Sequence, residues 1–327
     1  MKYSGYAATY TLLTMVLAGA ATNAAAGEVN LYTSNSEDAV ALVLDAVAEQ
    51  APDIKINVIG GGSGSLLRRI EAEQSAPAAD LFWSSGFSTL AGFSHLFTAY
   101  HSSEVDALLP ALQADNAPWT GTNTHVTVIM VNSDVLDGDP PQTWEALMDE
   151  RWAGQVTMAD PANSSSSYAQ LYGIYQLYGE EGVRNLADIV ELQGSTSGVY
   201  KAVAQGEYPL GMTMEYAAQR YIHGGQSDIS KIYPADGTFL SPEGMAFIQN
   251  GPNPEEAKQV YDLLLSHDVQ EQLFDLTFRR PSRADLDDAI ANSGLPLMKD
   301  LNIIEVDEAE AGEQRDYLLE LWADARG

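Results

Sequence analysis

Residues 157–178 read T-M-A-D-P-A-N-S-S-S-S-Y-A-Q-L-Y-G-I-Y-Q-L-Y, a short apolar strand that leads through a cluster of serines into a helix. The Asp160-Pro161 pair ends the strand, and the Asn and Ser residues that follow are types preferred at helix N-termini. The first turn of a helix has unpaired backbone N–H groups, and its dipole favours a negative group. The stretch therefore predicts either a simple helix cap or an anion site formed by Asn163, Ser164, Ser165 and Ser166.

The same arrangement recurs in the N-terminal part of the chain. Predicted strands at 28–32, 54–59 and 80–83 each run into a turn rich in Ser, Thr or Gly and then into a helix. Strands that alternate with helices predict an α/β sheet, whose ligands bind outside the carboxyl ends of the strands. We therefore expect these turns to contribute to one site. The ligand-binding residues predicted from them are Thr33, Ser34, Ser36, Ser63, Gly64, Ser65, Ser84 and Ser85.

The turn after the second strand, Gly60-Gly61-Gly62-Ser63-Gly64-Ser65, is rich in glycine. Glycines let backbone amides approach a ligand closely. The turn lacks the G-K-[ST] ending of a P-loop and the G-x-G-x-x-G spacing of a dinucleotide site. A nucleotide-hydrolysing site is therefore not predicted.

The N-terminus has the features of a secretory signal. Lys2 precedes the apolar residues 10–18, and Ala24-Ala25-Ala26 fits the A-x-A pattern of a cleavage site. The apolar stretch is too short to span the ~30 Å hydrocarbon core of a membrane. We therefore expect a signal peptide at 1–26, removed near Ala26, and export to the periplasm. The absence of cysteine means that the exported chain relies on its core rather than on disulfides.

The composition is strongly acidic, with 46 Asp and Glu against 16 Lys and Arg and a formal net charge of −30. Such a surface repels nucleic acid and anionic lipid, so neither is an expected partner. Local hydrogen-bond donors would have to hold an anionic ligand against the repulsion of this negative surface. We interpret the acidity as a property of the solvated surface, suited to high salt, and not as a binding device.

A length of 327 residues predicts two lobes. The strand at 125–131 is expected to cross into the second lobe, and the strand at 245–248 to return to the first, with crossovers near Thr127 and Ser241. The predicted division is 27–127 plus 242–280 for lobe 1, and 128–241 plus 281–327 for lobe 2. In lobe 2, polar residues that follow predicted strands join the ligand-binding set, namely Glu215, Tyr216, Asp236 and Thr238.

Several motifs carry a family resemblance. They are Leu31-Tyr32-Thr33-Ser34, Gly62-Ser63-Gly64-Ser65-Leu66-Leu67, Ala79-Asp80-Leu81-Phe82-Trp83, Gly206-Glu207-Tyr208 and Tyr233-Pro234-Ala235-Asp236-Gly237-Thr238. The chain resembles the periplasmic solute-binding proteins of bacterial ABC importers, in the group of ferric-iron-binding proteins and their relatives for phosphorylated sugars, phosphoglycerate and aminoethylphosphonate. The resemblance implies a type II binding protein with two α/β lobes, each a mixed sheet flanked by helices. It also implies a ligand cleft between the lobes, a membrane permease as partner, a monomer, no cofactor and no enzymatic activity.

The iron-binding branch typically uses a His, a Glu and two adjacent tyrosines as ligands. By motif position this chain has Ser36 for the His, Ser85 for the Glu, and Tyr216-Ala217 for the tyrosine pair. Ferric iron prefers anionic oxygen donors, which serine does not provide. No metal ligand is therefore predicted, except Tyr216 if the chain binds Fe(III), which stays an alternative.

Ser and Thr beside helix N-termini suit a phosphate or phosphonate, because they bind an anion without a counter-charge. The predicted ligand is therefore a small organophosphate or organophosphonate, with Glu215, Tyr216 and Asp236 facing its remainder; a carboxylate fits the same donors. The basic cluster Arg279-Arg280-Pro281-Ser282-Arg283 is either an anion contact near the hinge or a basic loop among acidic neighbours. A secreted hydrolase is a remote alternative, since the sequence lacks a G-x-S-x-G elbow and a recognisable Ser, His and Asp arrangement.

Overall fold

The computed structural model describes residues 27–114 and 117–327. The predicted signal peptide lies outside these residues. Within the described part, no helix combines the length and the apolar character that crossing a bilayer requires.

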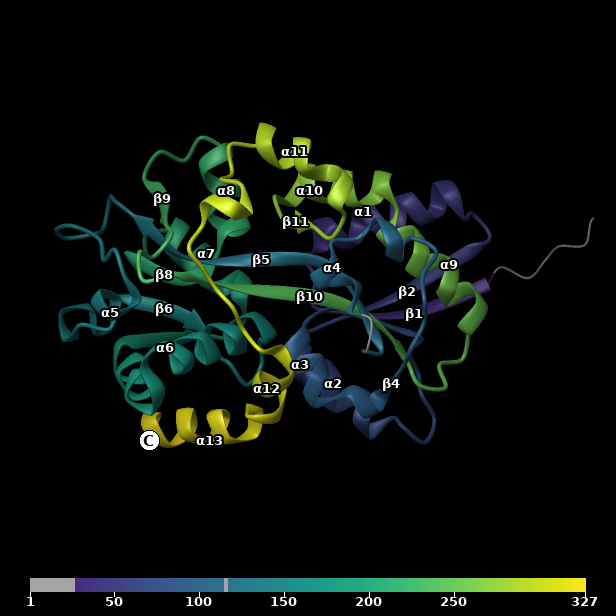
Figure 1. Ribbon diagram of the computed structural model, residues 1–327, viewed down its shortest axis with the longest axis horizontal. Coiled ribbons are helices and arrows are strands. Elements are labelled where there is room, and N and C mark those ends of the chain that lie inside the picture. The colour runs from purple at the N-terminus through teal and green to yellow at the C-terminus, as the bar shows by residue number, and fades with distance from the viewer. Residues whose placement is uncertain (1–26, 115–116) are drawn as a thin grey trace, which may run out of the picture.

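A mixed β-sheet runs through the molecule in the order β2-β1-β3-β10-β5-β8-β6-β7 (Figure 1). We call the β1–β4 side the first half and the β6–β9 side the second half. Strands β1, β2 and β3 are parallel, as are β6, β7 and β8, whereas β10 is antiparallel to β3 and β5, and β5 is antiparallel to β8. The strands are β1 (Gly27–Thr33), β2 (Ile54–Gly60), β3 (Leu81–Gly86), β4 (Phe97–Thr98), β5 (Trp119–Asn132), β6 (Val156–Ala159), β7 (Val190–Gln193), β8 (Leu210–Met214), β9 (Ile229–Ile232), β10 (Thr238–Ile248), β11 (Arg280–Pro281) and β12 (Ile303–Ile304).

Helices cover both faces of this sheet (Figure 1). They are α1 (Glu37–Gln50), α2 (Ser63–Ala72), α3 (Phe87–Gly92), α4 (Pro110–Gln113), α5 (Trp144–Leu147), α6 (Ser165–Ile189), α7 (Thr196–Ala204), α8 (Glu215–His223), α9 (Pro254–Leu265), α10 (His267–Thr277), α11 (Asp287–Asn292), α12 (Glu308–Glu313) and α13 (Arg315–Arg326).

Successive side chains along each strand point to opposite faces of the sheet. Leu31 packs with α1 and α9, whereas its neighbour Tyr32 packs with α2 and α3. In the second half Ile129 packs with α6 and α13, whereas Met130 packs with α7 and α8. Helices therefore bury both faces of the sheet in each half. The ends of the strands are the part of the sheet left accessible to a ligand.

Strands β5 and β10 belong to both halves. Residues 119–126 of β5 pair with β10, and residues 127–131 pair with β8. The predicted crossover near Thr127 is thus the point where β5 changes partner. The sequence predicts strand only from 125, because the preceding W-T-G-T-N-T is polar and resembles a loop; it is strand because β10 provides its hydrogen-bond partners.

The C-terminal segment contacts both halves. Helix α12 packs against α3 and α13 packs against α6. The guanidinium of Arg315 lies 6.0 Å from the ring centre of Phe93 in the first half and 5.2 Å from that of Tyr168 in α6. Residues 281–327, predicted to belong to the second lobe, therefore bridge the two halves.

The sequence predicts separate helices before and after Gly179, and α6 does consist of two helical segments, divided by a non-helical backbone conformation at Gly179 where φ is 64°. One predicted boundary differs from the structure: the second predicted helix, Gly182 to Val190, included Val190, which instead begins β7 beside β6. The edge position of β7 explains the error, because a four-residue strand with one paired neighbour has too weak a pattern to recognise.

The packing of α6 on β10 yields a stability prediction. A Cβ added at Gly173 would lie 2.5 Å from ring atoms of Phe239. Gly173→Ala should therefore destabilise the fold by about 1 to 3 kcal/mol through overpacking, despite the usual preference for Ala in helices. Chemical denaturation measures this change. Asn185→Ala, at an exposed position of the same helix, is the control and should not destabilise; an equally stable Gly173→Ala protein would contradict the packing argument.

Candidate ligand-binding cleft

A cavity of about 340 Å³ lies between the two halves, at the carboxyl ends of β1, β2, β3, β6 and β7. Its size is near the lower end of the ~300 to 1,000 Å³ range of small-molecule sites. Its walls are mostly hydroxyl-bearing side chains and glycines. The lining residues are Ser34, Asn35, Ser36, Gly61, Gly62, Ser63 and Ser84 from the first half; Asn163, Ser164, Ser165, Ser166, Gly194, Ser195, Thr196, Ser197, Tyr200 and Tyr216 from the second; and Glu243 and Arg279.

The helices α1, α2, α6 and α7 begin at this cavity, because their N-cap residues Ser36, Gly62, Ser164 and Ser195 all line it. Ser164 and Ser195 cap their helices by accepting hydrogen bonds from the amides of Ser167 and Gly198. The other two N-caps make no side-chain cap bond. The cavity is therefore surrounded by the positive ends of helix dipoles.

Three of these four helices, α2, α6 and α7, differ from α1 and from most other helices of the described chain in their first turns. Helices α1, α5 and α8 to α13 carry Asp or Glu in the first turn, where a carboxylate is favourable. Helices α2, α6 and α7 carry none, and neither do the short α3 and α4. In so acidic a chain, three cleft-facing helix starts thus keep their positive ends free of fixed negative charge.

The two halves touch directly beside the cavity. The backbone amide of Ser165 donates to Ser63 Oγ at 3.0 Å, and Arg68 donates to Asn163 Oδ1 at 3.3 Å. Asp38 on α1 and Arg220 on α8 form an ion pair between the halves. These contacts describe a closed arrangement of the two halves.

Glycines in the α2 turn make this approach possible. A Cβ at Gly64 would lie 2.5 Å from the carbonyl oxygen of Ala162, and one at Gly62 would lie 2.7 Å from that of Asn163. The predicted role of Gly64 was contact with the ligand, but the structure places Gly64 outside the cavity and against the opposite half. These two glycines therefore serve the contact between the halves.

Glu243, from β10, is a carboxylate that lines the cavity. It is 4% exposed and lies 2.9 Å from His125 Nε2. Ser84 donates to the same carboxylate at 2.7 Å from a left-handed backbone conformation, with φ 75°, that is uncommon for serine. Burial alone raises the pKa of Glu243, but His125, Arg279 and Ser84 outweigh it and lower this pKa to about 2. The side chain is therefore an anion at neutral pH.

Arg279 is the basic residue that lines the cavity. Its guanidinium lies 4.7 Å from the ring centre of Tyr216, and its Nε is buried without a hydrogen-bond partner among the described residues. Burial lowers the pKa of Arg279, but Tyr216 and Glu243 raise it more, so the group stays charged. Arg280 and Arg283 of the same basic cluster do not line the cavity, because they pair with Glu215 and with Glu104 and Asp285.

The structure places part of the predicted site at the cavity. The predicted residues that line it are Ser34, Ser36, Ser63, Ser84, Asn163, Ser164, Ser165, Ser166 and Tyr216. The hydroxyl of Ser34 donates to the carbonyl of Ser84, whereas the hydroxyl of Ser36 is buried without a partner in the described part. The predicted residues outside the cavity are Thr33, Gly64, Ser65, Ser85, Glu215, Asp236 and Thr238.

Two of the outlying carboxylates have structural partners. Glu215 accepts hydrogen bonds from Arg280 at 2.8 and 2.9 Å and from Tyr233 at 2.6 Å. Asp236 accepts from the Trp144 amide at 2.8 Å, at the start of α5. Glu215 and Asp236 both follow a predicted strand in the sequence, but their hydrogen-bond partners hold their side chains away from the cavity.

The remaining predicted residues outside the cavity lie at strand ends or in the first turn of α2. The Thr33 hydroxyl accepts from the Asn35 amide at 3.1 Å, and Thr238 donates to the carbonyl of Thr127. Ser65 is exposed and bonds Arg68 at 3.3 Å. Ser85 is fully buried, and its hydroxyl has no partner among the described residues.

Sequence reasoning missed several lining residues. The turn Gly194-Ser195-Thr196-Ser197 has the same composition as the predicted turns, but the strand before it, β7, was not recognised. Glu243 gave no signal, because it lies in the polar part of β10 that sequence reasoning did not assign to a strand. Asn35 and Tyr200 were also not selected, and Arg279 was left open between two roles.

The Ser84, Glu243 and His125 contacts do not form a catalytic triad. Glu243 lies between the serine and the histidine, and the histidine makes no hydrogen bond to the serine. A nucleophilic serine needs the histidine next to it to accept its proton. The arrangement gives no support to a hydrolase.

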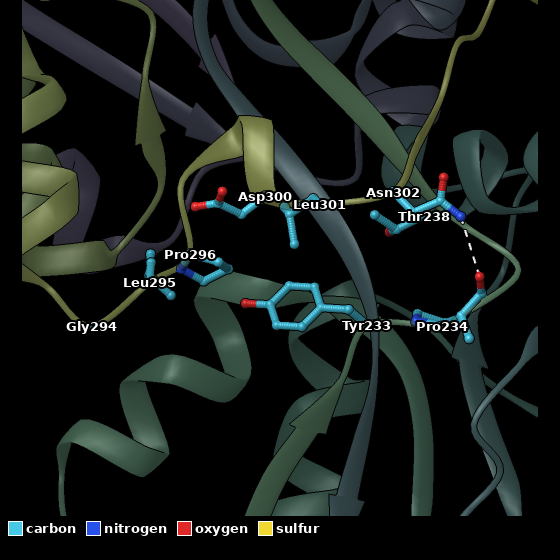
Figure 2. A pocket seen from close by; sticks show the side chains of 10 residues that line it. Tyr233, Pro234, Thr238, Gly294, Leu295, Pro296, Asp300, Leu301 and Asn302 are labelled. Carbon is cyan, nitrogen blue, oxygen red and sulfur yellow. Dashed lines mark hydrogen bonds between the residues drawn. The ribbon is translucent and has the colours of Figure 1, made fainter.

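A larger cavity of about 610 Å³ lies elsewhere, between the loop before β10 and the segment 294–302 (Figure 2). Figure 2 shows the ring of Tyr233 across its middle, with Leu301 above it and Pro296 beside it. The charged residue in its described lining is Asp300, whose negative charge would repel an anion. No helix of eight or more residues begins in this lining, so the cleft between the halves is the better candidate.

Comparisons with known proteins agree with this geometry. Residues 76–311 match the family model described as "Bacterial extracellular solute-binding protein". The chain belongs to the bacterial extracellular solute-binding proteins. The predicted family is thus confirmed.

Individual relatives are distant. Iron uptake protein A1 of Synechocystis sp. is 26% identical over 298 residues, which cover 83% of this chain and 78% of that protein. The periplasmic binding protein P5PA superposes with a TM-score of 0.84 at 22% identity, covering 92% of this chain and 100% of P5PA. AfuA from Actinobacillus pleuropneumoniae, with exogenous fructose-6-phosphate bound, has a TM-score of 0.81 at 22% identity, with coverage of 91% and 98%. These structures confirm the predicted type II periplasmic binding protein fold.

The glycine contact predicts how this solute-binding protein closes. Gly64→Ala should hold the halves apart, because the added methyl meets a backbone oxygen that cannot move aside. Small-angle scattering should then give a larger radius of gyration than that of the unaltered protein under the same conditions. Gly61→Ala is the matched control, since its Cβ would meet only Leu66 of its own half at 3.4 Å. Equal radii for all three proteins would contradict a glycine-dependent closure.

Proposed function

We propose that this chain, as the substrate-binding component of an ABC importer, captures a small organophosphate or organophosphonate in the cleft between β1–β3 and β6–β7. We further propose that it does so in the periplasm as a monomer, after loss of residues 1–26, and passes the ligand to the membrane permease. The observation that carries this proposal is the set of helix starts at α2, α6 and α7, which lack acidic residues and line one cavity with hydroxyl groups.

Phosphate and phosphonate groups suit these donors. Each offers three oxygens that accept hydrogen bonds from backbone amides and serine hydroxyls at helix N-termini. Arg279 lines the same cavity and adds a fixed positive charge. A carboxylate offers fewer oxygens to so many donors, which is why we rank it below a phosphoryl or phosphonyl group.

The similar proteins include both candidate ligand classes. The AfuA structure holds exogenous fructose-6-phosphate, an organophosphate. The name of the Synechocystis relative instead refers to iron uptake. Both ligand classes therefore occur among proteins similar to this chain.

Ferric iron is the second candidate, because Tyr216 and Tyr200 both line the cavity. The arrangement is less suitable for iron than for an anion. Glu243 is the carboxylate among the described lining residues, and the described chain has no cluster of three or more His, Cys, Asp or Glu residues able to hold a metal. Burial also raises the pKa of Tyr200, which disfavours the tyrosinate that iron requires.

Substitution at the start of α6 tests the proposed anion site. Ser165→Asp places a fixed carboxylate among the donors, so it should abolish binding of fructose 6-phosphate or 2-aminoethylphosphonate, whichever the unaltered protein binds. Replacing Ser165 and Ser166 by Ala leaves the backbone donors and should weaken binding about 10- to 150-fold per essential hydroxyl. Isothermal titration calorimetry measures both.

The matched control is Ser266→Asp, at the N-cap of α10 and outside the cavity. It should leave affinity unchanged, while thermal melting shows that both Asp variants fold. Undiminished affinity in the Ser165→Asp protein would exclude the anion site at α6.

A spectroscopic test separates the two ligand classes. An iron site that uses Tyr216 would give a visible tyrosinate charge-transfer band with Fe(III), lost in Tyr216→Phe. We expect no such band on titration with Fe(III), because serines occupy the positions of the missing ligands. A strong band with tight Fe(III) binding, abolished by Tyr216→Phe, would reverse the ranking.

A further inference from the structure

The carboxylate of Glu243 is held from one side only. His125 Nε2 at 2.9 Å, Ser84 Oγ at 2.7 Å and Asn123 Nδ2 at 3.4 Å all approach Oε2. No donor of the described residues reaches Oε1, and Oε1 is not among the buried atoms without a partner. Since Glu243 lines the cavity, its Oε1 is the oxygen left available to a ligand.

The low pKa of Glu243 keeps this oxygen negatively charged across the physiological range. Arg279 is the compensating charge in the lining, and the remaining described lining residues are neutral. A ligand that carries only anionic oxygens would be attracted by Arg279 and the helix starts but repelled by Glu243. A ligand with a hydrogen-bond donor near Glu243 would be favoured by both groups.

We propose that Glu243 selects ligands that carry a hydroxyl or ammonium group as well as the anionic group, by accepting a hydrogen bond at Oε1. The ligand class is thus a phosphoryl or phosphonyl compound with a hydrogen-bond donor a few bonds away. This inference rests on the proposed function, because it assumes that the anionic group binds at the helix starts. It assigns to Glu243 the role that sequence reasoning gave to Glu215 and Asp236, which the structure places outside the cavity.

The fixed position of the carboxylate makes such selection effective. Hydrogen bonds to Oε2 orient the group before the ligand arrives, so little side-chain freedom is lost on binding. A ligand that covers Oε1 without donating to it removes this oxygen from water and leaves it unpaired, which penalises that ligand. Sites of this kind discriminate against analogues that lack the donor more strongly than apolar pockets do.

Three phosphonates that differ at one position test the inference. 2-Aminoethylphosphonate, 2-hydroxyethylphosphonate and ethylphosphonate carry an ammonium, a hydroxyl and no donor on the same two-carbon chain. At least one of the first two should bind the unaltered protein about tenfold or more tightly than ethylphosphonate, the lower range for a hydrogen bond to a charged group. Calorimetric titration gives the three dissociation constants.

Glu243→Gln should remove this preference. The amide lacks the negative charge, so affinity for the donor-bearing phosphonate should fall about tenfold or more while that for ethylphosphonate stays or improves. Glu243→Asp keeps the negative charge but moves the carboxylate away from the cavity by the length of one methylene group. If the Gln variant does not fold, the Asp variant tests the same loss of preference. Glu37→Gln is the matched control: Glu37 is exposed in the first turn of α1 and does not line the cavity, so its loss should leave the preference unchanged.

Each outcome has a defined interpretation. Equal affinity for the three phosphonates, or a full preference retained in both Glu243 variants, overturns the role of Glu243 and leaves the anion site intact. Failure of all three to bind, together with failure of fructose 6-phosphate, overturns both the inference and the proposed function.

Discussion

The antiparallel pairing of β10 with β5 is the constraint on which the rest of this structure depends. The pairing runs from Ala246 opposite Trp119 to Leu240 opposite Val126, and β5 then continues as a neighbour of β8. Because β10 also pairs with β3, one continuous set of backbone hydrogen bonds joins the two halves. The polar side chains of these strands need hydrogen-bond partners when buried, and it is here that Glu243, Asn123 and His125 come together under the cleft.

Buried charges in this region follow the rule that an ion is tolerated inside a protein only when it is paired. The side chains of Glu215 and Arg280 are each 2% exposed and bond one another in a bidentate geometry. Their mutual pairing explains why neither contributes to the cavity, although both lie close to residues that do, Tyr216 and Arg279. Glu243 differs because its protein partners all bond one carboxylate oxygen, so a charged and partly unsatisfied group faces the ligand space.

The distribution of charge is the second organising feature. The chain carries a net charge of −30, and most of its described helices carry an acidic residue in the first turn. The first turns of α2, α6 and α7 contain Ser, Thr or Gly and no acid. These three helices therefore present the positive ends of their dipoles to the cleft without a neutralising carboxylate, in contrast to the acidic surface.

The sequence by itself determined the family, the α/β class and the turns rich in serine and glycine that follow the strands, because strand periodicity, helix caps and turn chemistry are local properties. The start of α6 at Ser165 and the cluster from Asn163 to Ser166 in the cleft lining follow from such local signals. Only the tertiary structure decided which acidic residue lines the cleft, since Glu215 and Glu243 differ not in local sequence pattern but in their partners on distant segments, Arg280 and His125. It likewise decided that Gly64 lies against the opposite half and outside the cavity, because the approach of two segments about a hundred residues apart depends on the packing of the whole sheet and leaves no trace in either segment alone.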